Sequence, residues 1–101
     1  MPEFFPALPI PSFSPVPDRV WVYILQTADL ALYIGQTNSL PERLRKHRLG
    51  LGSKHTRDHG QSRLVYCEGP FSLAKAVQRE RQLKRWSRAK KEALIAAILP
   101  S

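Results

Sequence analysis

The chain has 101 residues, 43% hydrophobic and 24% charged, which fits one globular domain and excludes coiled-coil, collagen-like and wholly disordered chains. Sixteen Lys and Arg against eight Asp and Glu give a formal net charge of +8, which indicates a polyanionic partner, with nucleic acid as the first candidate. The longest apolar stretch, residues 93–100, is far shorter than the roughly 18 residues that a membrane span requires. The single cysteine, Cys67, excludes an internal disulfide and favours a reducing compartment, the cytoplasm.

The N-terminal segment is rich in proline. Six of the nine prolines lie in the first 17 residues, where they remove backbone donors and fix φ so often that neither helix nor sheet can continue. We therefore predict a Pro-rich arm over residues 1–17 and an ordered domain over residues 18–101. Because the arm carries Phe4, Phe5 and Leu8, we expect it to lie against the domain or against a neighbouring chain.

The domain begins with a predicted hairpin. Residues 20–25 are β-branched and aromatic on both alternating faces, which is typical of a strand covered on two sides. A turn leads to residues 31–35, which predict an antiparallel partner that ends at Gly35. For Tyr23 and Tyr33 to share a face, paired residues must both be odd or both be even, as with Tyr23 opposite Tyr33.

A first helix is predicted over residues 40–49. Ser39 stands at the N-cap position and Glu42 three residues later, which is the spacing of a capping box. Gly50 is expected to end this helix.

The second half of the chain predicts one more strand and two more helices. The strand is expected at residues 64–67, a helix capped by Ser72 runs through Trp86, and another helix starts at Ser87. The resulting order, ββαβαα, predicts an α+β fold with a small, three-stranded, mostly antiparallel sheet flanked by helices.

Glu80 interrupts the apolar pattern of the second helix. At about 100° per residue, one stripe of this helix collects Leu73, Ala76, Val77, Glu80 and Leu83. A carboxylate on a core-facing stripe needs a partner, because desolvating an unpaired charge is costly. Two alternatives stay open: an ion pair with Lys84 or with an arginine of another element, and a metal site, for which Mg²⁺ is suited.

Arg43 and His47 are four residues apart and therefore neighbours on the first predicted helix, beside its apolar stripe. The Arg43 guanidinium is suited to phosphate oxygens, and the His47 imidazole is suited to proton transfer near neutral pH. The alternative is that both are solvated surface residues.

Taken in order, Trp21-Val22-Tyr23, Tyr33-Ile34-Gly35, Arg43, His47 and Glu80 make a series that resembles the GIY-YIG nuclease superfamily, over about residues 19–99. The likeness is closest to small single-domain bacterial members, and the nuclease domain of the bacterial excision-repair incision protein has similar spacing. The resemblance implies a three-stranded sheet and hydrolysis of phosphodiester bonds with one divalent ion, Mg²⁺ or Mn²⁺, with DNA repair as the expected setting.

The resemblance also implies catalytic roles. Glu80 would hold the metal ion, and Arg43 would bind the scissile phosphate. The proton of the attacking water would go to Tyr33, to Tyr23 as the less favoured phenol, or to His47, and this choice stays open.

Basic side chains are expected to follow the backbone of the nucleic acid, with DNA preferred over RNA. Together with the glycine of the second motif, the predicted contacts are Gly35, Lys46, Lys54, Arg57, Lys84 and Arg85. Further cations on the later helices would extend this surface: Lys75, Arg79, Arg81, Arg88, Lys90 and Lys91. Tyr66 and Trp86 are expected in the core, with base stacking as the alternative.

Two other classes of function remain. One is a catalytically silent nucleic-acid-binding module. The other is an interaction domain in which the arm recruits a partner and the basic face binds an acidic protein.

Overall fold

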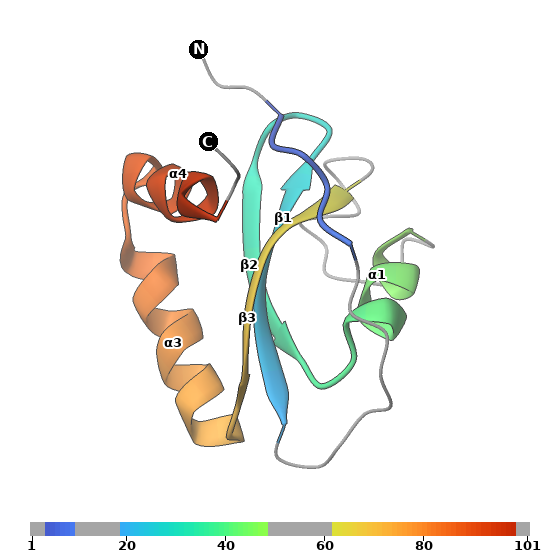
Figure 1. Cartoon of the computed structure of the whole chain (residues 1–101), viewed down its shortest axis with the longest axis vertical. Helices are drawn as coiled ribbons and strands as arrows, with labels where there is room; N and C mark the ends of the chain where they lie inside the picture. Colours follow the sequence, from blue (N-terminus) through green and yellow to red (C-terminus); the bar gives the residue numbers. More distant parts are fainter. Residues whose placement is uncertain (1–3, 10–18, 49–61, 99–101) are drawn as a thin grey trace.

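The computed structural model describes residues 4–9, 19–48 and 62–98, and its six elements follow the predicted ββαβαα order (Figure 1). The elements are β1 (Val20–Thr27), β2 (Leu32–Thr37), α1 (Leu40–Arg48), β3 (Ser62–Phe71), α3 (Leu73–Arg85) and α4 (Arg88–Ala97). The predicted α+β fold is confirmed. The predicted end of the second strand at Gly35 is wrong, because β2 continues to Thr37 and Gly35 is one of its paired residues.

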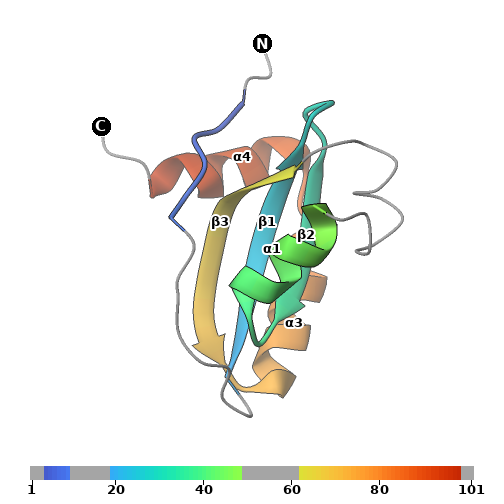
Figure 2. The same ribbon diagram turned by 90° about the vertical axis from the view of Figure 1, so that its right-hand side faces the viewer.

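The sheet is antiparallel with the order β2-β1-β3, so β1 is its central strand. Figures 1 and 2 show α3 and α4 on one face of the sheet and α1 on the other. Side chains alternate along β1, so that Val22 and Ile24 pack with α3 and α4 while Tyr23 and Leu25 pack with α1. β1 is thus covered on both faces, as its apolar sequence predicts.

Ala76 and Leu83, both fully buried, mark the inward face of α3. Leu73 was predicted on the same apolar stripe, but it is 55% exposed. The prediction is wrong because the buried stripe is centred on Ala76 and Leu83, and Leu73 lies at its margin on the same side as Glu80. Glu80 is therefore placed at the edge of the core and not within it.

Residues 4–9 of the arm lie against the sheet. The Phe5 amide donates to Gln26 Oε1 at 2.7 Å, and the Leu8 amide donates to the Leu64 carbonyl at 2.8 Å. Phe5 and Leu8 also pack against the two cores, one on each side of the sheet. Among the described residues, no helix combines the length and the apolar character that a membrane span requires.

Candidate active site

Tyr23 lies opposite Gly35 in the β1–β2 ladder, and Leu25 lies opposite Tyr33. Every pair in this ladder joins two odd or two even residue numbers, so Tyr23 and Tyr33 share one face of the sheet. The prediction that paired residues are both odd or both even is confirmed, although the partner of Tyr23 is Gly35 and not Tyr33. The two phenols lie on the face that α1 covers.

Gly35 provides the space that Tyr23 occupies. A Cβ atom on residue 35 would lie 2.4 Å from the Tyr23 hydroxyl and 2.6 Å from Tyr23 Cζ, both well inside van der Waals contact. The ring of Tyr23 therefore crosses β2 at the one position without a side chain. Gly35 is buried beneath it, and its predicted contact with nucleic acid stays a prediction.

The phenol of Tyr23 interacts with three other predicted site residues. It is only 1% exposed, and burial raises the pKa of Tyr23 far above its ordinary value of 10. Tyr33 raises this pKa further, the Arg43 guanidinium lowers it, and the Glu80 carboxylate raises it. Side chains from β1, β2, α1 and α3 thus act on one hydroxyl group. We call Tyr23, Tyr33, Arg43 and Glu80 the four-residue site.

Arg43 is placed by the packing of α1. Leu40 and Leu44 are buried against the sheet, and Arg43, between them in sequence, is half-buried. It lines a small polar cavity of about 110 Å³ at the start of α1, together with Lys46. Glu42 lines this cavity too and pairs with Lys46, so Arg43 is the lining cation without an acidic partner among the described residues.

The predicted capping box at the start of α1 is wrong. The Ser39 amide donates to Thr37 Oγ1 at 3.1 Å, and Thr37 Oγ1 donates to the Ser39 carbonyl at 3.2 Å. Glu42 instead lies 3.9 Å from Lys46 Nζ, one helical turn ahead. Thr37, the last residue of β2, accepts the hydrogen bond from the Ser39 amide that the capping box assigned to Glu42. The turn from β2 to α1 brings the Thr37 hydroxyl closer to this amide.

His47 is in α1, one turn after Arg43 in the chain. Its side chain lies outside the described residues, as do Lys54 and Arg57 in full. Their predicted roles therefore stay predictions.

Glu80 has a cation partner within its own helix. Its Oε1 atom lies 3.4 Å from Lys84 Nζ, and this is the ion pair that the sequence offered as one alternative. The Glu80 side chain is 17% exposed and that of Lys84 is 55% exposed. Because the Lys84 end of this helical pair is exposed, the pair contributes only about 0.3–0.5 kcal/mol and does not commit the carboxylate to a structural role.

The donor set at Glu80 fits a hard divalent cation. Among the described residues, no group of three or more His, Cys, Asp or Glu side chains is close enough to hold a metal ion. A single carboxylate at the solvent edge, with water completing the coordination shell, is a typical arrangement for Mg²⁺ and not for zinc.

Arg79 was predicted to contact the phosphate backbone, but it forms an internal ion pair. Its Nε donates to Glu68 Oε1, its Nη2 donates to Glu68 Oε2 at 3.2 Å, and its Nη1 donates to Gln82 Oε1 at 2.8 Å. Glu68 also accepts a hydrogen bond from the Tyr66 hydroxyl. Sequence patterns missed this network because Glu68 and Arg79 belong to different elements, and only the packing of α3 on β3 brings them together.

Tyr66 and Trp86 are both engaged within the protein. Tyr66 is buried in the core on the α3 side, as predicted. Trp86 packs against that core, and its ring centroid lies 5.2 Å from Arg79 Cζ and 4.2 Å from Lys90 Nζ.

Comparison with known proteins identifies the fold. The GIY-YIG catalytic domain matches residues 19–93, a range that includes every member of the four-residue site. The chain belongs to the GIY-YIG family. This family consists of nucleases, so the resemblance predicted from the spaced motifs is confirmed at the level of the family.

Relatives of similar size belong to a small group of GIY-YIG proteins named UPF0213. A UPF0213 protein of Natronomonas pharaonis is 43% identical over 76 residues, which are 75% of this chain and 89% of that protein. One of Clostridium perfringens is 40% identical over 77 residues, which are 76% of this chain and 83% of that protein.

A solved GIY-YIG relative has a similar structure. The solution NMR structure of a UPF0213 protein from Bacillus halodurans matches with a TM-score of 0.53 and 38% sequence identity, covering 79% of this chain and 85% of that one. The overall fold that carries the four-residue site is therefore similar to that of an experimentally determined relative.

Proposed function

We propose that this protein is a metal-dependent endonuclease that hydrolyses phosphodiester bonds in DNA by a one-metal mechanism. The observation that carries the proposal is that Tyr33 shares a face of the sheet with the buried Tyr23, and that the charges of Tyr33, Arg43 and Glu80 all act on the Tyr23 phenol. A phenol pair, a guanidinium and a carboxylate are the groups needed to position water, bind phosphate and hold a cation. Membership of a nuclease family supports the same activity.

Arg43 is assigned to the scissile phosphate. Arg43 is half-buried, which strengthens its electrostatic interactions, and it lines the small polar cavity together with Glu42 and Lys46. Its fixed positive charge opposes the negative charge that develops on the phosphoryl oxygens as water attacks.

Glu80 is assigned to the metal ion. A bound Mg²⁺ or Mn²⁺ would supply Lewis-acid stabilisation to the phosphate and the leaving oxygen. For its part, Glu80 must exchange its weak pairing with Lys84 for the cation, and its position at the margin of the core leaves it accessible for this exchange.

The proton of the attacking water goes to Tyr33 or to His47 in this proposal. Tyr23 is the weaker candidate, because burial raises its pKa and keeps its phenol protonated at neutral pH. A protonated Tyr23 is suited to donate a hydrogen bond and so to orient the water or the phosphate. The sequence alone favoured Tyr33 over Tyr23, and the burial of Tyr23 supports that order.

The basic surface supports DNA as the substrate. Lys46, Lys84 and Arg85 are exposed cations on α1 and α3, suited to backbone contacts that do not read sequence. A reducing, cytoplasmic compartment, predicted from the single cysteine, is consistent with an intracellular DNA substrate and a setting in DNA repair.

A cleavage assay tests the proposal. Supercoiled plasmid, linear duplex and single-stranded DNA, with matched RNA, are incubated with the protein in Mg²⁺, in Mn²⁺ and in EDTA. Products that require the divalent ion and that disappear in an Arg43→Ala protein of wild-type melting temperature support the nuclease. DNA binding without cleavage under every condition would instead identify the catalytically silent binding module.

A further inference from the structure

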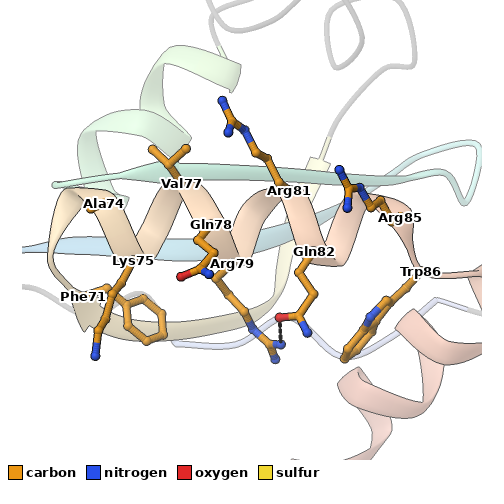
Figure 3. A pocket seen from close by; sticks show the side chains of 10 residues that line it. All are labelled: Phe71, Ala74, Lys75, Val77, Gln78, Arg79, Arg81, Gln82, Arg85 and Trp86. Carbon is orange, nitrogen blue, oxygen red and sulfur yellow. Dashed lines mark hydrogen bonds between the residues drawn. The ribbon is translucent and has the colours of Figure 1, made fainter.

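A groove runs along the outer face of α3, on the side of this helix that faces away from the sheet. Its volume is about 810 Å³, and Phe71 and Trp86 lie at its two ends (Figure 3). Lys75, Arg79, Arg81 and Arg85 line it, and none of its lining residues is acidic. We call this feature the α3 groove.

Three of the four cations in the α3 groove have no acidic partner among the residues that the structure describes. Arg79 is neutralised by its two contacts with the Glu68 carboxylate. Lys75, Arg81 and Arg85 are exposed, and within the described part of the chain none of them forms an ion pair. A groove lined by these three cations and by no acid attracts a polyanion.

Glu80 lies on the same helix as the α3 groove, between Arg79 and Arg81, which both line the groove. Because each helical residue turns by about 100°, Lys84, Arg81 and Arg85 follow Glu80 in that order around α3, from the edge of the core to its outer face. Figure 3 shows Arg81 and Arg85 extending from one side of the helix, and Lys75, Arg79 and Gln82 from the other. A strand bound at Glu80 therefore meets Arg81 and Arg85 as it leaves the site.

We propose that the α3 groove is a second binding site for the substrate, in which Arg81 and Arg85 bind the DNA backbone beyond the scissile phosphate. This inference rests on the proposed nuclease function. Guanidinium groups bind phosphate oxygens through paired donors, which suits the two arginines to this role. The ring of Trp86 is already contacted by Arg79 and Lys90, so the α3 groove binds phosphates and not stacked bases.

Binding is measured first, in EDTA so that no cleavage occurs, with a fluorescent DNA duplex over a range of salt concentrations. Arg81→Ala and Arg85→Ala each lower the slope of log affinity against log salt by about 0.9, which corresponds to about eightfold weaker binding at 0.1 M salt for each lost phosphate contact. Unchanged affinity and slope in the Arg81→Ala/Arg85→Ala protein would overturn the proposal.

Two control variants distinguish a loss of binding in the α3 groove from a loss caused by a lower net charge. Arg45→Ala removes one exposed cation from α1, on the opposite face of the sheet, and leaves the slope unchanged. The double variant Glu68→Gln/Arg79→Gln removes the internal ion pair at constant net charge and also leaves the slope unchanged. A loss in the Arg45→Ala protein equal to that in Arg81→Ala would show a diffuse charge effect and no groove.

Kinetics with short and long substrates then separate this proposal from the nuclease activity itself. Arg81→Ala/Arg85→Ala raises KM for a long duplex with kcat unchanged, and it has no effect on an oligonucleotide too short to reach from Glu80 to Arg85. Equal effects on both lengths would place these arginines at the cleavage site and refute the α3 groove. If the wild-type protein binds through the α3 groove but never cleaves, the nuclease proposal fails and the binding site stands.

Competition with poly-glutamate tests the identity of the ligand. Poly-glutamate that competes as well as DNA at equal charge would overturn the assignment of DNA.

Discussion

The ring of Tyr23 lies over the Cα atom of Gly35, where a Cβ atom would come within 2.4 Å of the hydroxyl. This relationship explains why the second motif ends in glycine. The Tyr23 hydroxyl, on whose charge Tyr33, Arg43 and Glu80 act, occupies the space that a side chain at residue 35 would fill.

Gly35→Ala is expected to destabilise the protein by about 1–3 kcal/mol, because the new methyl group overpacks a site with no free volume. Displacement of Tyr23 should also lower kcat in the fraction that remains folded. The matched control is Tyr23→Phe, which keeps the ring and removes only the hydroxyl. Melting temperature and cleavage rate are measured on both proteins, and a Gly35→Ala protein with wild-type values for both would refute the close packing.

The two buried tyrosines predict a loss of stability in alkali. Burial and the hydrogen bond to Glu68 raise the pKa of Tyr66 to about 12, and burial raises that of Tyr23 still further. Between pH 10 and pH 12 the unfolded chain loses these protons while the folded chain keeps them, so stability falls with rising pH in this window and is unaffected by these groups below it.

Denaturant unfolding at pH 8, 10 and 11 checks this expectation. The stability of the wild-type protein should fall more steeply above pH 10 than that of Tyr66→Phe, since the substituted ring cannot titrate. Absorbance of tyrosinate in the folded wild-type protein should likewise show late titration of Tyr23 and Tyr66. Parallel pH profiles for wild type and Tyr66→Phe would contradict the raised pKa.

Some of these features follow from sequence because they depend on neighbours in the chain. Ser72 was predicted as a helix cap and Ser87 as the start of the next helix, and both side chains accept hydrogen bonds from backbone amides, those of Lys75 and Lys90. The pairing of odd with odd and even with even residues in the β1–β2 ladder follows from the alternation of side chains, once Tyr23 and Tyr33 are assumed to share a face.

Other features depend on how distant elements pack and could not be predicted. Alternation gives the face of Tyr23 but not its cross-strand partner, since moving the register by two residues preserves every face. The pairing of Glu68 with Arg79 depends on the position of α3 along β3, for which no local pattern gives a signal. The family motifs gave the members of the four-residue site, and only the fold gives the reason for Gly35.

Arg43→Ala is expected to reduce kcat by about 10²–10³-fold, the typical cost of removing a group that stabilises charge in the transition state. Lys46→Ala, in the same polar cavity, should weaken binding and leave kcat nearly unchanged, because its exposed ammonium pairs with Glu42 and contributes only to the field around the site. Comparison of kcat and KM for the two proteins checks the difference. Equal losses of kcat would show that Arg43 has no special role.

The ion pair of Glu68 and Arg79 is expected to be a main anchor of α3. Both side chains are largely shielded from solvent, so Glu68→Gln leaves the Arg79 charge without its partner and should cost about 1–3 kcal/mol. Thermal unfolding measures this cost. The double variant Glu68→Gln/Arg79→Gln should recover much of it, because neither charge is then left unpaired, and failure to recover would argue that the two residues act independently.

A substitution at Glu80 distinguishes a nuclease from a protein that only binds DNA. Glu80→Gln keeps the size of the side chain and removes the charge that the proposed mechanism needs for the cation, so cleavage should fall by at least about 10²-fold. Binding to DNA should be unchanged or slightly tighter, because the substitution removes a negative charge from a surface that meets a polyanion. Stability should change by no more than about 0.5 kcal/mol, since the Lys84 ammonium that loses its partner is 55% exposed and is solvated by water. Lys84→Ala breaks the same ion pair and serves as the control: it should raise KM through the lost backbone contact and preserve kcat.

Two outcomes would contradict this expectation. If Lys84→Ala abolished cleavage as fully as Glu80→Gln, the ion pair itself would be the functional unit. If Glu80→Gln cleaved at the wild-type rate and responded to Mg²⁺ as before, the metal site at Glu80 would be refuted.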